Sequence, residues 1–179
     1  VMKELALHIL DIAQNSIVAG ATLIRIGITE DMQGDLLHMT VEDNGKGMPS
    51  EMVERVMNPY TTSRTTRRVG MGLPLLHDAC RAANGMLTIE SAVNEGTRVL
   101  ATMQLSHIDR QPLGDITGVI VLLFSANPSI DFVYSHIRNG NSYIFDTREV
   151  KELLEGIPLN TPEVIKSIRE MIASNLDEL

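Results

Sequence analysis

The chain has 179 residues, of which 44% are hydrophobic, and a formal net charge of −8. This length predicts one domain, or one domain with an appendage, and the apolar content is enough for a core. The acidic balance argues against general nucleic-acid binding, and no apolar run approaches the roughly 20 residues of a membrane span.

The single cysteine, Cys80, excludes an internal disulfide. The first residues lack the basic and apolar pattern of a signal peptide. We therefore expect a cytoplasmic protein with neither a membrane nor a nucleic acid as its partner. A phosphate site remains compatible with the negative charge, because backbone amides can supply the complementary charge.

Apolar residues at helical spacing open the chain, and Gly20 ends that pattern. Alternating apolar residues follow in two runs separated by a Gly-Asp turn, as in paired strands. The elements expected here are a buried helix over 3–19, strands over 22–29 and 35–42, a loop over 43–49, and a short helix over 51–57 capped by Ser50.

The segment 58–69 is polar and rich in Thr and Arg, which disfavours regular structure. A helix over 73–84 and a hairpin with strands at 86–91 and 97–105 come next. This order predicts an α+β fold, a sandwich with helices on one face of a mixed sheet.

A second unit is expected after residue 106, so that the chain divides into 1–106 and a small α+β extension over 107–179. We expect the extension to bind a partner or to pack on the first unit. The run 116–124 is compatible with a helix or a strand. A hairpin turns at Asn139-Gly140, and two helices follow, one capped by Thr147 and one opened by Thr161-Pro162.

Asp11 and Asn15 are four residues apart and therefore share one face of the first helix. A carboxylate and an amide on an otherwise apolar helix are costly unless they have partners. The alternative to a binding role is that both satisfy backbone groups inside the core.

Three glycine-containing segments are further candidates. Asp43 ends a strand and is followed by Gly45 and Gly47, which allow close backbone approach, and an aspartate there can accept a hydrogen bond from an exocyclic amine. Gly70 and Gly72 precede a helix whose free amides and dipole favour phosphate. Plain turns are the alternative for the first of these segments and for the third, 95–97.

Together these segments resemble the boxes of the GHKL superfamily, which comprises gyrase, heat-shock-90 chaperones, histidine kinases and MutL. The segment 11–21 resembles the N box in its MutL form, 42–48 the G1 box and 70–73 the G2 box. The segment 58–64 resembles a Pro-Phe-x-Thr-Thr-Lys stretch of histidine kinases, and Gly96-Thr97 the final box. The resemblance spans 3–105 and implies the two-layer Bergerat fold.

The resemblance also implies binding of ATP with Mg²⁺ under a lid that contains Arg64. Asn15 would coordinate the magnesium, and Asp43 would bind the adenine amine, assisted by Thr97 through its hydroxyl and a water. Asp11 would be the catalytic carboxylate. The implied nucleotide-binding residues are Asn15, Asp43, Gly45, Gly47, Met48, Thr62, Arg64, Gly70, Met71, Gly72, Leu73 and Thr97.

Three positions depart from the family pattern. Hydrolytic members carry Glu at the position of Asp11, kinases often carry Lys at that of Val18, and Pro74 replaces a glycine common in kinases. Three functions therefore stay open. They are an ATP-binding regulator with slow hydrolysis, a kinase of the histidine-kinase or anti-sigma type acting on a partner in trans, and a non-catalytic ATP sensor. Each implies a protein partner.

Overall fold

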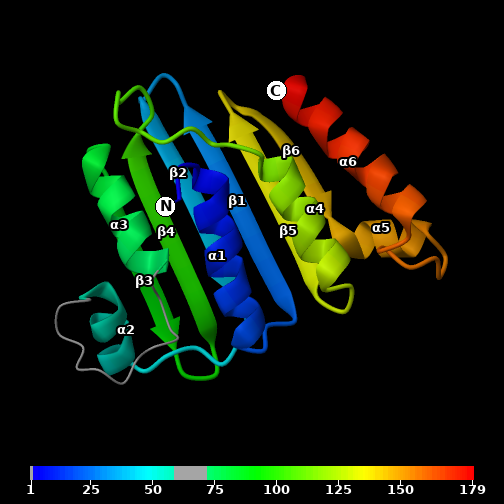
Figure 1. Ribbon diagram of the computed structural model, residues 1–179, viewed down its shortest axis with the longest axis horizontal. Helices are drawn as coiled ribbons and strands as arrows, with labels where there is room; N and C mark the ends of the chain where they lie inside the picture. Colours follow the sequence, from blue (N-terminus) through cyan, green and yellow to red (C-terminus); the bar gives the residue numbers. More distant parts are fainter. Residues whose placement is uncertain (1, 59–71) are drawn as a thin grey trace.

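The computed structural model describes residues 2–58 and 72–179. Its centre is one six-stranded mixed sheet with the order β3-β4-β2-β1-β5-β6 (Figure 1). The β1–β5 pair is parallel, and the other neighbouring pairs are antiparallel. The strands are β1 (Leu23–Asp31), β2 (Leu36–Asp43), β3 (Met86–Ala92), β4 (Gly96–Gln104), β5 (Asp131–Arg138) and β6 (Asn141–Asp146).

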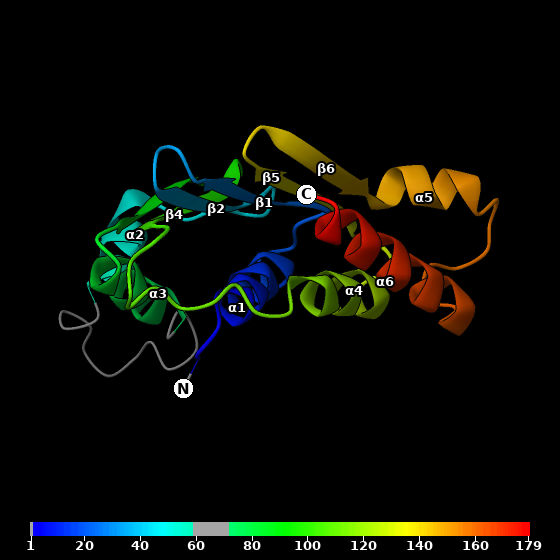
Figure 2. The ribbon, with the colours of Figure 1, turned by 90° about the horizontal axis from the view of Figure 1, so that it is seen from above.

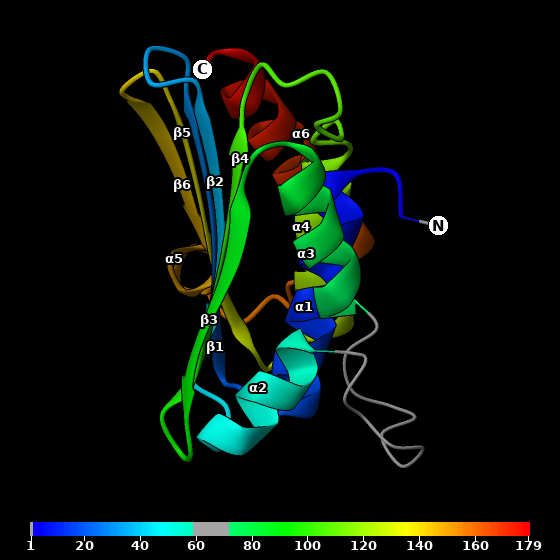
Figure 3. The same cartoon turned by 90° about the vertical axis from the view of Figure 1, so that its left-hand side faces the viewer.

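Four helices cover one face of this sheet, with α3, α1, α4 and α6 side by side (Figures 2 and 3). Helix α5 lies apart from this layer, at the end of β6 (Figures 2 and 3). The predicted α+β sandwich with helices on one face of a mixed sheet is therefore confirmed. The helices are α1 (Leu5–Val18), α2 (Ser50–Met57), α3 (Gly72–Ala82), α4 (Ile116–Ala126), α5 (Thr147–Leu153) and α6 (Pro162–Asp177).

The core lies between the sheet and the helix layer. Strand alternation points Ile24, Ile26 and Ile28 of β1 toward the helices, and each is at most 2% exposed. From the helix layer, Leu5 and Ile9 of α1 meet them and are equally buried. Each such side chain stabilises the fold by about 1.5–3 kcal/mol. This burial holds α1, and with it Asp11 and Asn15, firmly against the sheet.

Residues beyond 106 extend the same sheet, because β5 pairs with β1. The segment that leads to them crosses the start of α1, where Leu5 N donates to Pro112 O over 3.0 Å and Ala6 N to Leu113 O over 2.8 Å. The division at residue 106 stays a prediction. The described structure adds that the strands on both sides of it form one continuous sheet.

The run 116–124, open between helix and strand, forms helix α4. Apolar residues surround this helix because it packs on α1, α6 and the sheet. Asp115 caps it by accepting a hydrogen bond from Gly118 N over 2.9 Å. No helix within 2–58 and 72–179 is long and apolar enough to cross a bilayer.

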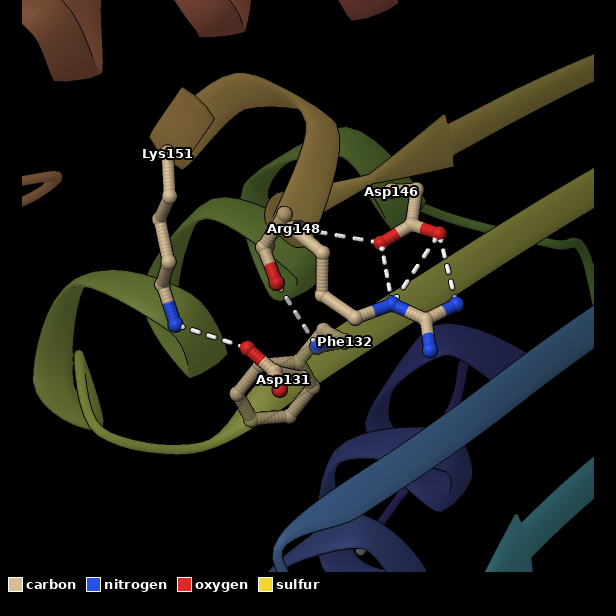
Figure 4. A network of polar contacts seen from close by, with 6 residues as sticks. Asp131, Phe132, Asp146, Arg148 and Lys151 are labelled. Atoms are coloured by element: carbon tan, nitrogen blue, oxygen red, sulfur yellow. Dashed lines mark hydrogen bonds and ion pairs between the residues drawn. The ribbon is translucent and has the colours of Figure 1, made fainter. Parts of the chain in front are cut away.

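Two predicted caps are wrong. The Thr147 hydroxyl accepts a hydrogen bond from Phe132 N over 2.9 Å and so ties α5 to β5, while Asp146 caps α5 by accepting from Arg148 N (Figure 4). Ser50 is the first residue of α2 rather than its cap, which is Pro49. In both cases the predicted cap lies one residue from the observed one, and for α5 the hydrogen bond from Phe132 N to the Thr147 hydroxyl accounts for the difference.

A chain of buried polar contacts links β1 and β5. The Tyr134 hydroxyl lies 2.6 Å from Nδ1 of His136, and Nε2 of His136 lies 2.7 Å from Oε2 of Glu30. Nε of Arg138 donates to the same Glu30 oxygen over 2.9 Å. These contacts lower the pKa of Glu30, with the hydrogen bond from His136 as the largest cause. The carboxylate is therefore held in its ionised form.

Candidate functional site

The Asp11 carboxylate on α1 lies directly against the first residue of α3. A Cβ built on Gly72 would lie 1.5 Å from Oδ2 of Asp11, so only glycine fits there without displacement. The start of α3, whose first backbone amides have no intrahelical partner, is thereby held beside a carboxylate. Leu73 is 6% exposed, so its side chain belongs to the core.

Burial raises the pKa of Asp11, and the nearby His8 partly opposes this rise. His8 is itself 1% exposed, and burial lowers its pKa. Its Nε2 lies 3.0 Å from Oε1 of Gln111, in the segment that crosses α1. Asp11 therefore binds a proton more tightly than an exposed aspartate, which makes it a stronger base.

Asn15 lies one turn after Asp11 and is half-buried. Its backbone oxygen accepts from Ala19 N over 2.9 Å, while its side-chain amide makes no hydrogen bond to any residue of 2–58 or 72–179. The alternative that this amide satisfies backbone groups of the core is not seen among those residues. A half-buried amide with no partner among the described residues is a candidate to bind a ligand.

Asp43 is the last residue of β2, and both of its carboxylate oxygens accept hydrogen bonds. Oδ2 accepts from the Ser16 hydroxyl over 2.5 Å, and Oδ1 accepts from Gly45 N over 2.8 Å. Thr97 on β4 is its direct neighbour in the sheet. The register and the two donors thus orient an acceptor group beside a hydroxyl.

The loop after Asp43 is clamped between α1 and the β3–β4 hairpin. A Cβ on Gly45 would lie 2.9 Å from the Ala19 Cβ, and one on Gly47, whose φ is +65°, would lie 1.9 Å from the Ala92 oxygen. Lys46 N donates to Ala19 O over 2.9 Å. Both glycines are therefore required by the close approach of backbone on either side.

Thr97 belongs to a small hydroxyl cluster. Its Oγ1 lies 2.8 Å from Oγ of Ser91 on β3, and the same Ser91 oxygen accepts from Met48 N over 2.9 Å. Asp43, Ser91 and Thr97 also line a cavity of about 350 Å³ at this end of the sheet. Its lining includes Glu42, Glu90 and Arg98, which strand alternation places on the opposite face of the sheet. The cavity is open to solvent on one side and combines carboxylate, hydroxyl and backbone groups.

Sequence reasoning missed Ser16, Ser91 and Asn44 as parts of this site. A hydroxyl in the apolar stripe of the first helix was the available signal for Ser16. Asn44 holds the α1–β1 connection, since its Oδ1 accepts from Thr22 N over 2.8 Å and from Leu23 N over 3.1 Å. Nothing in the local sequence indicates the partners of Ser91 or Asn44.

The predicted site residues that the structure describes form two groups. Asp11 meets Gly72, and Asp43 meets Thr97 and the loop that contains Gly45, Gly47 and Met48, with Asn15 on α1 beside Ser16. Four further predicted residues lie outside the described residues, namely Thr62, Arg64, Gly70 and Met71.

Residues 1–107 match the family described as histidine kinase-, DNA gyrase B-, and HSP90-like ATPase. The chain belongs to this ATPase family. The match covers α1 through β4, which carry every described site residue.

Curated relatives share this ATPase region. The chain is 30% identical over 105 residues to the non-motile and phage-resistance protein of Caulobacter vibrioides, covering 56% of this chain and 12% of that one. It is 28% identical over 96 residues to sporulation kinase A of Bacillus subtilis, covering 54% and 15%. The chain thus matches under a fifth of the length of either relative.

Two solved structures share the fold. The N-terminal domain of a DNA repair protein superposes with a TM-score of 0.54 at 18% identity, covering 80% of this chain and 52% of that one. The Aquifex aeolicus MutL ATPase domain complexed with ADP superposes with a TM-score of 0.52 at 17% identity, covering 87% and 70%. Both cover more of this chain than residues 1–107, so the likeness of fold continues past the family match.

Proposed function

We propose that this protein binds Mg-ATP and hydrolyses it slowly, as a regulatory switch that acts on a protein partner. The main observation that supports nucleotide binding is that Ser16 and Gly45 orient the Asp43 carboxylate, with Thr97 beside it. A held acceptor of this kind suits an exocyclic amine. Membership of the ATPase family and the ADP complex of the MutL relative support the same assignment.

In this proposal the adenine lies at the end of β2 and β4. Asp43 accepts a hydrogen bond from the adenine amine, and Thr97 assists. Gly45 and Gly47 keep the loop thin enough for the ring to lie against it, and Met48 contributes an apolar wall. A guanine would present a carbonyl oxygen to Asp43, so two acceptors would meet without a proton between them.

The residues present fit a magnesium ion. Mg²⁺ takes oxygen ligands and keeps several waters, and the Asn15 side chain is free within the described residues to supply one oxygen. Those residues contain no cluster of three or more His, Cys, Asp or Glu, so phosphate oxygens and waters would complete the shell. When bound, the ion would neutralise charge on the phosphates.

The phosphates would meet the start of α3, where the amides of Gly72 and Leu73 are free of intrahelical partners. Asp11 lies beside them and accepts the proton of the attacking water as a general base. Its burial suits this role, because a raised pKa increases basicity. The shorter reach of Asp compared with Glu is the reason we expect slow turnover.

Phosphotransfer to a partner is the second candidate, because curated relatives include sporulation kinase A and sensor histidine kinases of the NtrY-like group. Incubation with γ-labelled ATP, alone and with lysate, separates the possibilities. Free phosphate from the purified protein supports hydrolysis, a labelled protein supports transfer, and binding without either supports a sensor. Failure of ATP to bind in calorimetry would contradict all three.

We further propose that 1–106 is the nucleotide-binding unit and that 107–179 communicates with it. The contact between His8 and Gln111 and the backbone pairing of Leu5 with Pro112 support this, since they join the crossing segment to α1 close to Asp11. A change in α1 on nucleotide binding would therefore reach the extension.

A further inference from the structure

The hydroxyl of Ser91 lies at the centre of three polar contacts. Its Oγ is 2.9 Å from Met48 N, 3.0 Å from the backbone oxygen of Gly96 and 2.8 Å from Oγ1 of Thr97. Ser91 itself is half-buried at the end of β3 and stands opposite Thr97 in the β3–β4 ladder.

The protons available to this cluster allow one arrangement that satisfies all three contacts. Met48 N–H can only donate, and the Gly96 carbonyl can only accept. Ser91 has a single proton, which must go to Gly96, since two bare oxygens 3.0 Å apart would otherwise repel. The contact between the two hydroxyls then needs the proton of Thr97, so Thr97 donates to Ser91.

This arrangement leaves Thr97 with only its lone pairs for a ligand. We propose that Ser91 is a positioning residue that holds the Thr97 hydroxyl as an obligate hydrogen-bond acceptor and thereby selects adenine over 6-oxopurines. The inference rests on the proposed function, in which Asp43 and Thr97 face the base.

The polarity matches one edge of adenine. Asp43 and Thr97 are neighbours in the sheet and both accept, so a ligand group between them must donate. The adenine 6-amino group carries two protons, whereas the 6-oxo group of hypoxanthine carries none. A water that donates to Thr97 has its second proton left for N1 of the base. N1 of adenine accepts a hydrogen bond from this water. N1 of hypoxanthine carries a proton, so two donors would face each other and no hydrogen bond would form.

The test compares ADP with IDP by calorimetry on the full chain. IDP changes the 6-position and N1 without adding the 2-amino group of guanine, and diphosphates avoid turnover. In Ser91→Ala the Thr97 hydroxyl is free to turn its proton toward the base. We expect its preference for ADP over IDP to fall about tenfold. Ser91→Thr keeps the hydroxyl and should retain the preference.

Thr102→Ala is the matched control. The Thr102 hydroxyl accepts from Met86 N over 3.2 Å and donates to Met86 O over 3.3 Å, in the same hairpin but away from the cavity. A purely structural role of Ser91 would weaken both nucleotides equally and leave their ratio unchanged, as expected for this control. An unchanged ratio in Ser91→Ala would overturn the inference.

Thr97→Val provides a second measurement that does not depend on the folding of Ser91→Ala. It removes the acceptor and should lower the ADP preference by a similar factor. If Ser91 acts through Thr97, adding Ser91→Ala to Thr97→Val changes the ratio no further. A fully retained preference in Thr97→Val overturns this inference alone. Equal binding of ADP and IDP by the wild type overturns it together with the assignment of Asp43 to the adenine amine. Absence of any ADP and ATP binding overturns the proposed function with it.

Discussion

The hydroxyl of Ser16 on α1 donates a 2.5 Å hydrogen bond to Oδ2 of Asp43 at the end of β2. Ser16 is 3% exposed, so water does not compete for this bond. The contact connects the helix that carries Asp11 and Asn15 to the strand end that faces the base. One hydroxyl therefore orients the proposed adenine-reading carboxylate and fixes its distance from the proposed magnesium ligand.

Ser16→Ala should weaken ATP binding by about 1 kcal/mol, or five- to tenfold, because the carboxylate loses one of its two protein donors. Calorimetry measures this directly. Ser125→Ala is a suitable control, since the Ser125 hydroxyl donates to Leu122 O within α4. An equal loss in both variants would point to a general effect on the helices rather than to Asp43.

Asp43→Asn should weaken ATP binding by about 1–3 kcal/mol, because one acceptor oxygen is exchanged for an amide that donates toward the adenine amine. GTP should bind the wild type much more weakly than ATP. Competition between the two nucleotides for the wild type and the variant gives both numbers. Equal affinities of the wild type for ATP and GTP would rule out Asp43 as the reader of the amine.

Asn15→Ala should weaken Mg-ATP binding more than metal-free ATP binding. Magnesium takes few protein ligands, so one lost oxygen is a large share of what the protein supplies. Titrations of ATP with excess Mg²⁺ and with a chelator measure the two affinities. A variant that loses the same factor in both conditions would show that Asn15 contacts the nucleotide and not the metal.

Asp11→Asn should reduce hydrolysis about 10²-fold with ATP affinity nearly unchanged, as expected on loss of a general base. The variant should also be more thermally stable at neutral pH. Burial raises the pKa of Asp11, so its ionised form costs stability above that pKa, and the cost disappears as pH falls through it. Melting temperatures across pH test this. Unchanged turnover would make Asp11 a structural carboxylate.

Glu30→Gln tests the polar chain between β1 and β5. Hydrogen bonds from His136 and Arg138 lower the pKa of Glu30, so its ionised form stabilises the fold above the ordinary pKa and that contribution is lost as pH falls through the lowered value. We expect a loss of about 1–3 kcal/mol near pH 7 that shrinks in acid. Glu90→Gln, at an exposed ion pair with Arg98, should cost under about 1 kcal/mol. Equal losses in both variants would contradict this account.

The ATPase family and the helical or extended nature of most elements could be read from the sequence. Periodicity over a whole element marks a buried face, and so it predicted α1, β1 and β2 to within about two residues. The resemblance of the segments around Asp11, Asn15, Asp43 and the glycines to the GHKL boxes could also be recognised from the sequence. These features are local, because backbone conformation and one-sided burial leave a repeating pattern in neighbouring residues.

Tertiary structure alone decided how the predicted hairpins join into one sheet, through the β2–β4 and β1–β5 pairs, and which polar groups meet. The run 116–124 is apolar all round, so its length and composition suited a buried helix or strand equally, and packing on α1 and α6 selected the helix. Both Thr147 and Asp146 have side-chain oxygens that can cap a helix. The Thr147 hydroxyl instead accepts a hydrogen bond from Phe132 N, so Asp146 caps α5. Ser91 finds Met48 across 43 positions in the chain. Such hydrogen bonds depend on strand register and on the distance between backbones, and neither leaves a trace in the residues next to them.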